Sequence, residues 1–198
     1  MIFRQLFDNS SSTYTYLLAD ESSREAIVID SVFEQSARDL ALIRELDLKL
    51  KYAIDTHCHA DHVTGAWLMK QKTGCKIGTA KIIGAANVDV ELNHDDVISF
   101  GQHSLEVRAT PGHTNGCLTY VTEDRACAFT GDALLIRGCG RADFQQGNAG
   151  TLYDSISEQI LSLPDSCLIY PGHDSNGRTV SSIAQEKASN PRIGGKAN

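Results

Sequence analysis

The sequence predicts an α/β (α+β) fold in which two β-sheets pack face to face and helices cover their outer sides. Two observations support this prediction. Short β-prone runs separated by polar turns recur in both halves of the chain, and each half also contains segments whose apolar residues recur at helical intervals. With 198 residues, the chain can bury a sizeable core as one large domain or two tight ones. We treat residues 1–198 as a single domain.

The first half of the chain opens with three strands joined by polar turns, a spacing typical of an antiparallel meander. Asp30 ends the third strand. Apolar residues then recur among charges as in an amphipathic helix, and a further strand follows. A short helix that stops at Gly74 and a brief strand complete this half. The expected strands are residues 2–7, 14–19, 26–29, 50–54 and 75–78, and the expected helices are residues 34–48 and 64–72.

Residues 80–96 fit no single element, because small and acidic residues interrupt every pattern. We expect a loop or a broken helix there, and a surface connection rather than a lid. The second half repeats the meander and adds two helices around a last strand. Its expected strands are residues 97–100, 105–109, 118–121, 126–129 and 167–170, and its expected helices are residues 151–161 and 180–188.

Four metal-competent side chains lie close together directly after the strand at residues 50–54. The segment reads Thr-His-Cys-His-Ala-Asp-His over residues 56–62. In an extended chain His57 and His59 point the same way, while Asp61 and His62 follow the turn and approach from another side. Chance clustering of surface polar residues is the alternative, but three of the seven histidines of the chain lie here. The segment therefore predicts a metal site.

Three later strands each lead through a glycine-containing turn to one further candidate ligand. His113 follows Pro-Gly after the strand at residues 105–109, Asp132 follows Thr-Gly, and His173 follows a second Pro-Gly. Glycine beside a ligand lets the backbone approach an ion, and rigid strand ends hold the ligand in place. Each residue alone is best explained as a turn residue. Together with residues 56–62, they predict one shared metal site.

Composition limits the possible partners and compartment. The formal net charge is −7, so the chain has no basic surface for nucleic acid or for an anionic membrane. It shows no leader, transit segment or membrane-spanning apolar run, and we expect a cytosolic protein. The six cysteines form no Cys-x-x-Cys pair and are expected to be reduced thiols. Cys58 and Cys139 lie within motifs, but neither is assigned as a ligand.

Residue types alone leave the number of metal ions open. His57, His59 and His113 suit one ion, while Asp61, His62 and His173 suit a second, with Asp132 bridging. Such a pair suits metal-activated hydroxide and the hydrolysis of an ester or thioester.

The Thr-His-x-His-Ala-Asp-His run, followed in order by His113, Asp132 and His173, resembles the metallo-β-lactamase superfamily over essentially the whole chain. That resemblance implies an αββα sandwich with a metal site at one edge between the sheets. Within the superfamily, residues 61–66 (Asp-His-Val-Thr-Gly-Ala) and 136–145 (Ile-Arg-Gly-Cys-Gly-Arg-Ala-Asp-Phe-Gln) are similar to the persulfide dioxygenases, also called sulfur dioxygenases. The second motif is long and separates this family from glyoxalase II.

The family resemblance implies one Fe(II) per chain, held by His57, His113 and Asp132. Two histidines and one carboxylate form the facial arrangement of non-haem Fe(II) oxygenases. The implied reaction oxidises glutathione persulfide with O2 and water to sulfite and glutathione. A homodimer is also implied. The residues implied to orient ligands and waters are His59, Asp61, His62 and His173, and the arginines expected to bind a glutathione carboxylate are Arg141 and Arg192.

The chain departs from the family pattern at two places. Ser175 stands where the family usually carries Tyr, and the family continues past Asn190-Pro191-Arg192 while this chain ends at residue 198. We expect a chain that is short at its C-terminus, or a junction to another domain such as rhodanese. A mitochondrial matrix location is expected only for a eukaryotic mature form. A glyoxalase II-like binuclear thioester hydrolase is the main alternative function, and a non-catalytic scaffold is the third.

Overall fold

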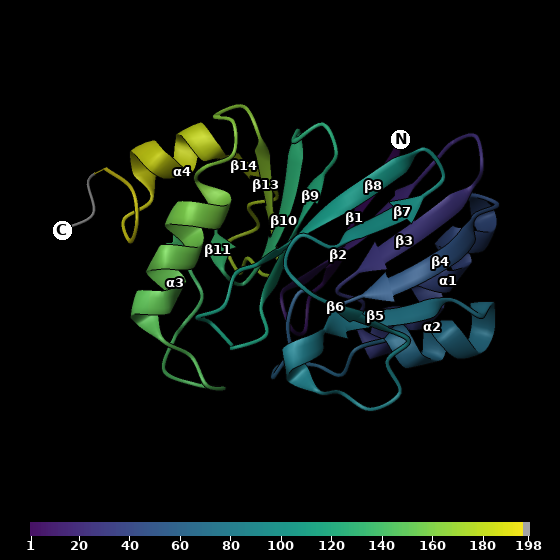
Figure 1. Cartoon of the computed structure of the whole chain (residues 1–198). Coiled ribbons are helices and arrows are strands. Elements are labelled where there is room, and N and C mark those ends of the chain that lie inside the picture. Colours follow the sequence, from purple (N-terminus) through teal and green to yellow (C-terminus); the bar gives the residue numbers. More distant parts are fainter. Residues whose placement is uncertain (196–198) are drawn as a thin grey trace.

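The computed structural model describes residues 1–195 and contains two six-stranded sheets packed face to face (Figure 1). The first half of the chain supplies β1 (Ile2–Asp8), β2 (Thr13–Ala19), β3 (Glu25–Ile29), α1 (Ser36–Glu45), β4 (Lys49–Ile54), α2 (Ala66–Thr73), β5 (Lys76–Ala80) and β6 (Val90–Leu92). The second half supplies β7 (Val97–Phe100), β8 (His103–Ala109), β9 (Leu118–Thr122), β10 (Cys127–Gly131), β11 (Leu134–Leu135), β12 (Gly138–Cys139), α3 (Ala149–Ser155), β13 (Leu168–Pro171), β14 (Ser181–Ser182) and α4 (Ile183–Ser189). The predicted αββα sandwich is confirmed.

Each half of the chain builds one sheet. The first sheet has the order β1-β2-β3-β4-β5-β6 and the second has the order β14-β13-β10-β9-β8-β7. Neighbours β1 to β3 and β7 to β10 pair antiparallel, as the two predicted meanders require. The strands β4, β5 and β6 add in parallel, and β13 pairs in parallel with β10.

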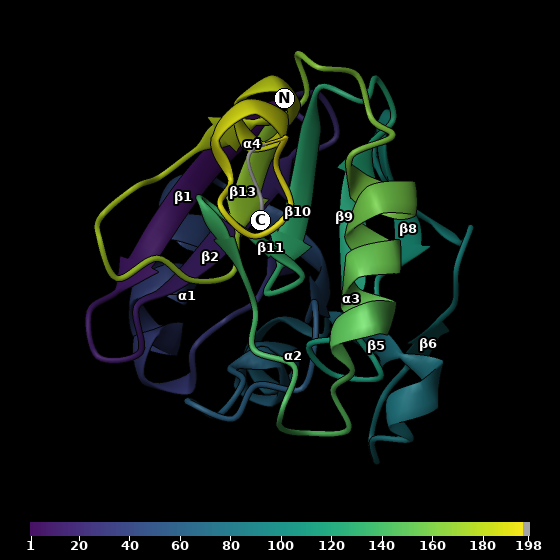
Figure 2. The same ribbon diagram turned by 90° about the vertical axis from the view of Figure 1, so that its left-hand side faces the viewer.

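The core lies between the two sheets, and alternation along the strands divides it from the helix layers. Tyr16 and Leu18 of β2 face the opposite sheet, while Leu17 of the same strand faces α1 and α2. The second sheet is covered in the same way by α3 and α4, through residues such as Leu152 and Ile183. In Figure 2 these two helices lie in front of β9, β10 and β13. Both sheets are therefore shielded on their outer sides.

Three short pairings were not expected from the sequence. Residues 80–96 include β6, which pairs in parallel with β5, so the expectation of a loop or broken helix was wrong for this strand. The hairpin β11–β12 and the strand β14 were also missed. Strands of two or three residues are too short to show an alternating pattern.

All four predicted helices differ in their bounds. The helix predicted at residues 34–48 is α1 (Ser36–Glu45), and the one predicted at residues 64–72 is α2 (Ala66–Thr73). The helix predicted at residues 151–161 begins earlier, where the side chain of Asn148 accepts a hydrogen bond from the Thr151 N–H at 2.9 Å, and it continues after α3 as a π-helical turn, Ile156–Ile160. The helix predicted at residues 180–188 begins only at Ile183, because the two preceding serines pair with β13. Among residues 1–195, no helix is long and apolar enough to cross a bilayer.

Main-chain hydrogen bonds join the two sheets at the edge where β4, β10 and β13 end. The Leu118 N–H donates to the Thr56 carbonyl at 2.7 Å, and the Tyr14 N–H donates to the Gly172 carbonyl at 2.8 Å. The Gly172 N–H in turn donates to the Gly131 carbonyl at 2.8 Å. These bonds fix the relative positions of the loops that carry the candidate ligands.

Candidate metal centre and its cavities

Three groups of candidate ligands lie at this edge of the sandwich, and the third, Asp30 and Asp55 with His59, overlaps the second group described below. His57, His113 and Asp132 each offer one ligand atom, and these atoms lie within 4.8 Å of one another. A second group with the same spacing consists of His59, Asp61, His62 and His173. The fold thus brings together the candidate ligands predicted from the sequence. These residues lie in two separate groups rather than around one point.

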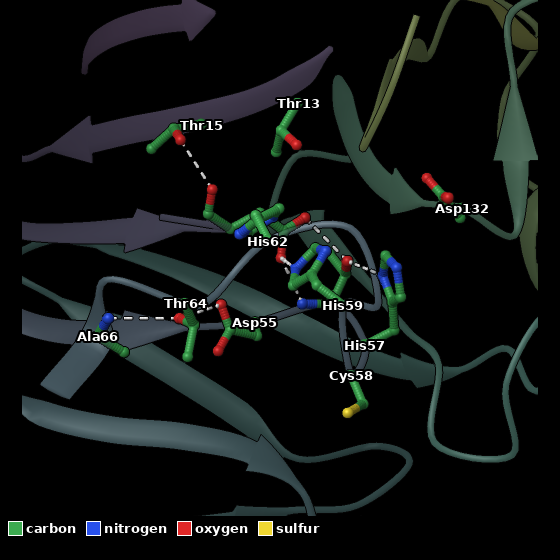
Figure 3. A network of polar contacts seen from close by, with 12 residues as sticks. Thr13, Thr15, Asp55, His57, Cys58, His59, His62, Thr64, Ala66 and Asp132 are labelled. Carbon is green, nitrogen blue, oxygen red and sulfur yellow. Dashed lines mark hydrogen bonds and ion pairs between the residues drawn. The ribbon is translucent and has the colours of Figure 1, made fainter. Parts of the chain in front are cut away.

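A buried carboxylate orients the imidazole of His57. Asp30, directly after β3, accepts hydrogen bonds from the Thr56 N–H at 2.6 Å and the Thr56 hydroxyl at 2.8 Å. The Thr56 hydroxyl has one proton, which it donates in the hydrogen bond to Asp30. It therefore accepts a hydrogen bond from Nδ1 of His57 at 2.9 Å. The Nε2 atom of His57 is then unprotonated and can bind a metal. Figure 3 shows His57, His59 and Asp132 around this network.

Sequence reasoning missed Asp30 and Thr56 as parts of the site. The signal for Asp30 was its place directly after a strand, where β3 and β4 run in parallel and bring their ends together. Asp30 also has a positive φ of 53°, which is uncommon for a residue with a side chain.

Hydrogen bonds also orient His113 and Asp132. Nδ1 of His113 donates to the carbonyl oxygen of Arg141 at 2.8 Å, because a carbonyl can only accept. In a neutral imidazole this leaves Nε2 as the nitrogen free to bind a metal, and it lies 3.7 Å from Oδ2 of Asp132. Both imidazoles of the first group therefore present Nε2, and the carboxylate presents Oδ2.

His173 lies between two carboxylates. Its Nδ1 is 2.7 Å from Oδ1 of Asp132, and its Nε2 is 2.9 Å from Oδ2 of Asp61. Burial lowers the pKa of His173, but the hydrogen bonds with Asp132 and Asp61 outweigh burial and raise the pKa to about 10. The imidazolium then donates from both nitrogens. Thr13 also contacts this Nε2, at 3.0 Å, and was not predicted as a site residue.

His59 belongs to a different set from His57, although the sequence suggested that both face one ion. Nε2 of His59 lies 3.2 Å from Oδ1 of Asp30, so the carboxylate that orients His57 also holds the ring of His59. Nδ1 of His59 and Nε2 of His62 are buried, and neither has a hydrogen-bond partner among residues 1–195. A water or a cation could satisfy these two atoms.

The electrostatics of the site follow from burial. Desolvation and the neighbouring His59 lower the pKa of His57 to about 3, so its imidazole is neutral. Burial raises the pKa of Asp132, but hydrogen bonding and charge attraction from His173 hold it below its usual range. Behind the site, burial raises the pKa of Asp55 to about 7. Asp132 is thus an anionic candidate ligand, and the imidazole of His57 in the same group is neutral.

Two glycines allow the close approach that these loops need. Gly131 has a φ of 51°, and a Cβ there would lie 2.5 Å from the hydroxyl oxygen of Thr56. A Cβ on Gly140 would lie 2.2 Å from the Asp132 carbonyl oxygen and 2.8 Å from Nδ1 of His113. The glycine before Asp132 was predicted to serve this purpose, whereas Gly140 was not singled out.

The first ligand group opens into a cavity of about 330 Å³ that also touches Asp61, Phe144 and Gln145. Arg141 lines this cavity and a neighbouring one of about 420 Å³, which Arg192 also lines. The guanidinium of Arg141 is exposed and pairs with Asp143 at 2.7 Å. Arg141 therefore lies beside the candidate metal centre, whereas Arg192 lines only the neighbouring cavity.

Residues 9–173 match the family model described as the metallo-β-lactamase superfamily. Mouse mitochondrial persulfide dioxygenase ETHE1 is 54% identical over 194 residues, covering 98% of this chain and 76% of the mouse protein. The hydroxyacylglutathione hydrolase GloC of Haemophilus influenzae is 33% identical over 198 residues, covering 89% of this chain and 91% of that protein.

Solved structures show the same likeness. The crystal structure of ETHE1 from Myxococcus xanthus has a TM-score of 0.95 and 51% sequence identity, covering 98% of this chain and 85% of that one. The identity to the two ETHE1 proteins exceeds the identity to the hydrolase over nearly the same stretch of chain.

Proposed function

Because the chain belongs to the metallo-β-lactamase superfamily and, within it, to the persulfide dioxygenases, we propose that it uses one Fe(II) to oxidise glutathione persulfide. The reaction consumes one persulfide, one O2 and one water, and yields glutathione, sulfite and two protons. The superfamily and the dioxygenase activity rest on the comparisons, whereas the metal and the thiol carrier are our proposals.

The arrangement of His57, His113 and Asp132 supports one iron at the first ligand group. Both imidazoles present an unprotonated Nε2, because Thr56 and the Arg141 carbonyl accept from their Nδ1 atoms. Two imidazoles and one carboxylate are the donor set that non-haem Fe(II) uses when it must leave positions open. Bound there, Fe(II) supplies the redox chemistry that lets O2 react with sulfur. We regard the orientation of these three side chains as the main structural support for the proposal.

We propose that the second group orients the metal ligands and neutralises the charge of Asp132. His173 donates to Oδ1 of Asp132 at 2.7 Å, which leaves Oδ2 of that carboxylate for the metal. Asp61 holds the other nitrogen of His173 at 2.9 Å. Partners of this kind set the orientation and basicity of a metal ligand. We propose this role for His59, Asp61, His62 and His173.

Substrate binding is proposed for the two arginines near the cavities. Arg141 pairs with Asp143 through a side chain that is 65% exposed, and an exposed pair of this kind exchanges at little cost. A carboxylate of glutathione can therefore replace Asp143. Arg192 lines the adjacent cavity of about 420 Å³, where the peptide can extend from Arg141.

Metal analysis joined to two activity assays tests this function. Protein purified without oxygen should contain about one iron per chain and should release sulfite as it takes up O2 with glutathione persulfide. A His113→Ala control should lose both iron and sulfite release. The proposal fails if the protein carries two metal ions per chain and hydrolyses lactoylglutathione, but releases no sulfite.

We further propose a homodimer in the cytoplasm of a bacterial cell, with rhodanese as a functional partner. The mouse relative is a mitochondrial protein, and for a eukaryotic source we propose the mitochondrial matrix instead. Light scattering on the purified protein tests the dimer, and a coupled assay with a purified rhodanese tests the partner.

A further inference from the structure

We propose that a third cavity, which His173 also lines, is an anion-binding subsite of the active site. This inference rests on the proposed function, because the anion is taken to be a carboxylate of the persulfide substrate or the sulfite product. Both present negatively charged oxygen atoms to the protein. The cavity has a volume of about 380 Å³ and shares Ser11 and His173 with the metal cavity.

Two guanidinium groups line this cavity, and each is anchored from behind by a buried carboxylate. Arg137 pairs with Glu186, whose side chain is fully buried, and Arg178 pairs with Asp174 at 3.0 Å, whose side chain is 2% exposed. The side chains of Arg137 and Arg178 are 33% and 39% exposed. The arginines are therefore fixed at one end and open to solvent at the other.

The two carboxylates are saturated by the protein. Glu186 accepts from Nη1 and the main-chain N–H of Arg137, and also from the Ser181 hydroxyl and the Asn190 amide. Glu186 does not line the cavity, whereas Asp174 does.

Asp174 is saturated in the same way. It accepts from the main-chain N–H groups of Asn176 and Arg178 at 2.8 and 2.9 Å, besides its pair with the Arg178 Nε. Neither carboxylate needs a further donor from the cavity.

Unused donors remain on the open side. Among residues 1–195, Arg178 makes one side-chain hydrogen bond, through Nε, so both of its terminal nitrogens are available. The side-chain amide of Asn176 and the hydroxyl of Ser175 line the same cavity and have no hydrogen-bond partner within those residues. A guanidinium fork with neighbouring amide and hydroxyl donors suits a carboxylate or sulfite oxygen. Each guanidinium is paired with one carboxylate, so the case for an anion rests on these unpaired donors rather than on an excess of positive charge.

The test introduces one negative charge into the cavity by a substitution that keeps the shape of the side chain. Asn176→Asp places a carboxylate in the cavity and keeps the main-chain bond to Asp174, while Asn87→Asp makes the same charge change at an exposed position that does not line the cavity. Equilibrium binding of sulfite and of glutathione is measured by calorimetry on the iron-loaded enzyme without oxygen. We expect Asn176→Asp to lower the affinity for sulfite, for glutathione or for both about tenfold. Asn87→Asp should leave both affinities unchanged.

Which of the two probes binds more weakly identifies the source of the anion. Weaker binding of sulfite alone assigns the subsite to the product, whereas weaker binding of glutathione with a raised KM for its persulfide assigns it to the substrate carboxylate. A second variant, Ser175→Tyr, fills the cavity without adding charge and should give the same pattern. If both variants bind both probes as the wild type does, the subsite is refuted. Failure of the wild type to release sulfite from glutathione persulfide would instead refute the proposed function, whatever the binding results.

Discussion

Replacing Asp61 by Asn separates an iron dioxygenase from a binuclear hydrolase. In the structure Oδ2 of Asp61 holds Nε2 of His173 at 2.9 Å, and Asp132 holds the other nitrogen at 2.7 Å. Asn keeps the shape of Asp61 but removes its charge. We expect iron near the wild-type level, because the three atoms proposed to bind it do not include Asp61, with activity lowered about 10- to 100-fold.

In the Asp61→Asn variant, the pKa of His173 should fall because one charge-assisted hydrogen bond is lost. Such a contact contributes about 1.5 to 3 kcal/mol, and the lower end applies here because the Asp61 side chain is 37% exposed. About 1.4 kcal/mol corresponds to one pKa unit. The pKa of His173 should therefore fall from about 10 to roughly 9, and the ring should stay protonated at pH 7 because Asp132 still holds it.

The assay combines three measurements on one purified variant. Iron content and O2 uptake are compared with the wild type, and NMR titration of the metal-free protein reports the pKa of His173. Asp165→Asn is the matched control, since that carboxylate pairs with Lys187 on the surface at the opposite end of β13. Loss of one equivalent of metal together with thioester hydrolysis in the Asp61 variant would refute the mononuclear assignment.

Three further predictions follow from the site. His113→Ala and Asp132→Ala should each abolish both iron binding and O2 uptake, because three protein ligands cannot lose one and retain a labile ferrous ion; full iron in either variant would remove that residue from the metal. Arg141→Ala should raise the KM for glutathione persulfide more than tenfold at unchanged iron content, the scale of one charge-assisted contact, and an unaltered KM would show an ordinary surface charge. Iodoacetamide followed by mass spectrometry should modify the exposed Cys58 first and leave Cys117 unmodified in the folded protein, because burial raises the pKa of Cys117 to about 11; rapid labelling of Cys117 would contradict the buried site.

Local sequence patterns predicted most of the sandwich. The longer strands carry enough apolar residues to show their alternation, and Gly74 marked the end of α2 by taking a left-handed conformation with a φ of 75°. The short pairings β6, β11–β12 and β14 had no such signal. Each depends on a partner strand and contributes only two or three residues.

The candidate site shows the same division. The sequence by itself determined which side chains meet at the edge of the sandwich, because His57, His113, Asp132 and His173 each follow a strand. The sequence did not determine which of the histidines belong to the same ligand group. His57 and His59 are two residues apart and chemically identical, yet they belong to different groups, and Asp30 orients both rings.

Only the tertiary structure could supply that carboxylate and its geometry. The parallel pairing of β3 with β4 brings Asp30 beneath Thr56, and the Thr56 hydroxyl then decides which nitrogen of His57 carries the proton. The cavity between Arg137 and Arg178 arises in the same way, since each arginine is fixed by a different buried carboxylate. A sequence pattern records the chemistry of each side chain, whereas proton positions and cavities depend on contacts between segments that are distant in the chain.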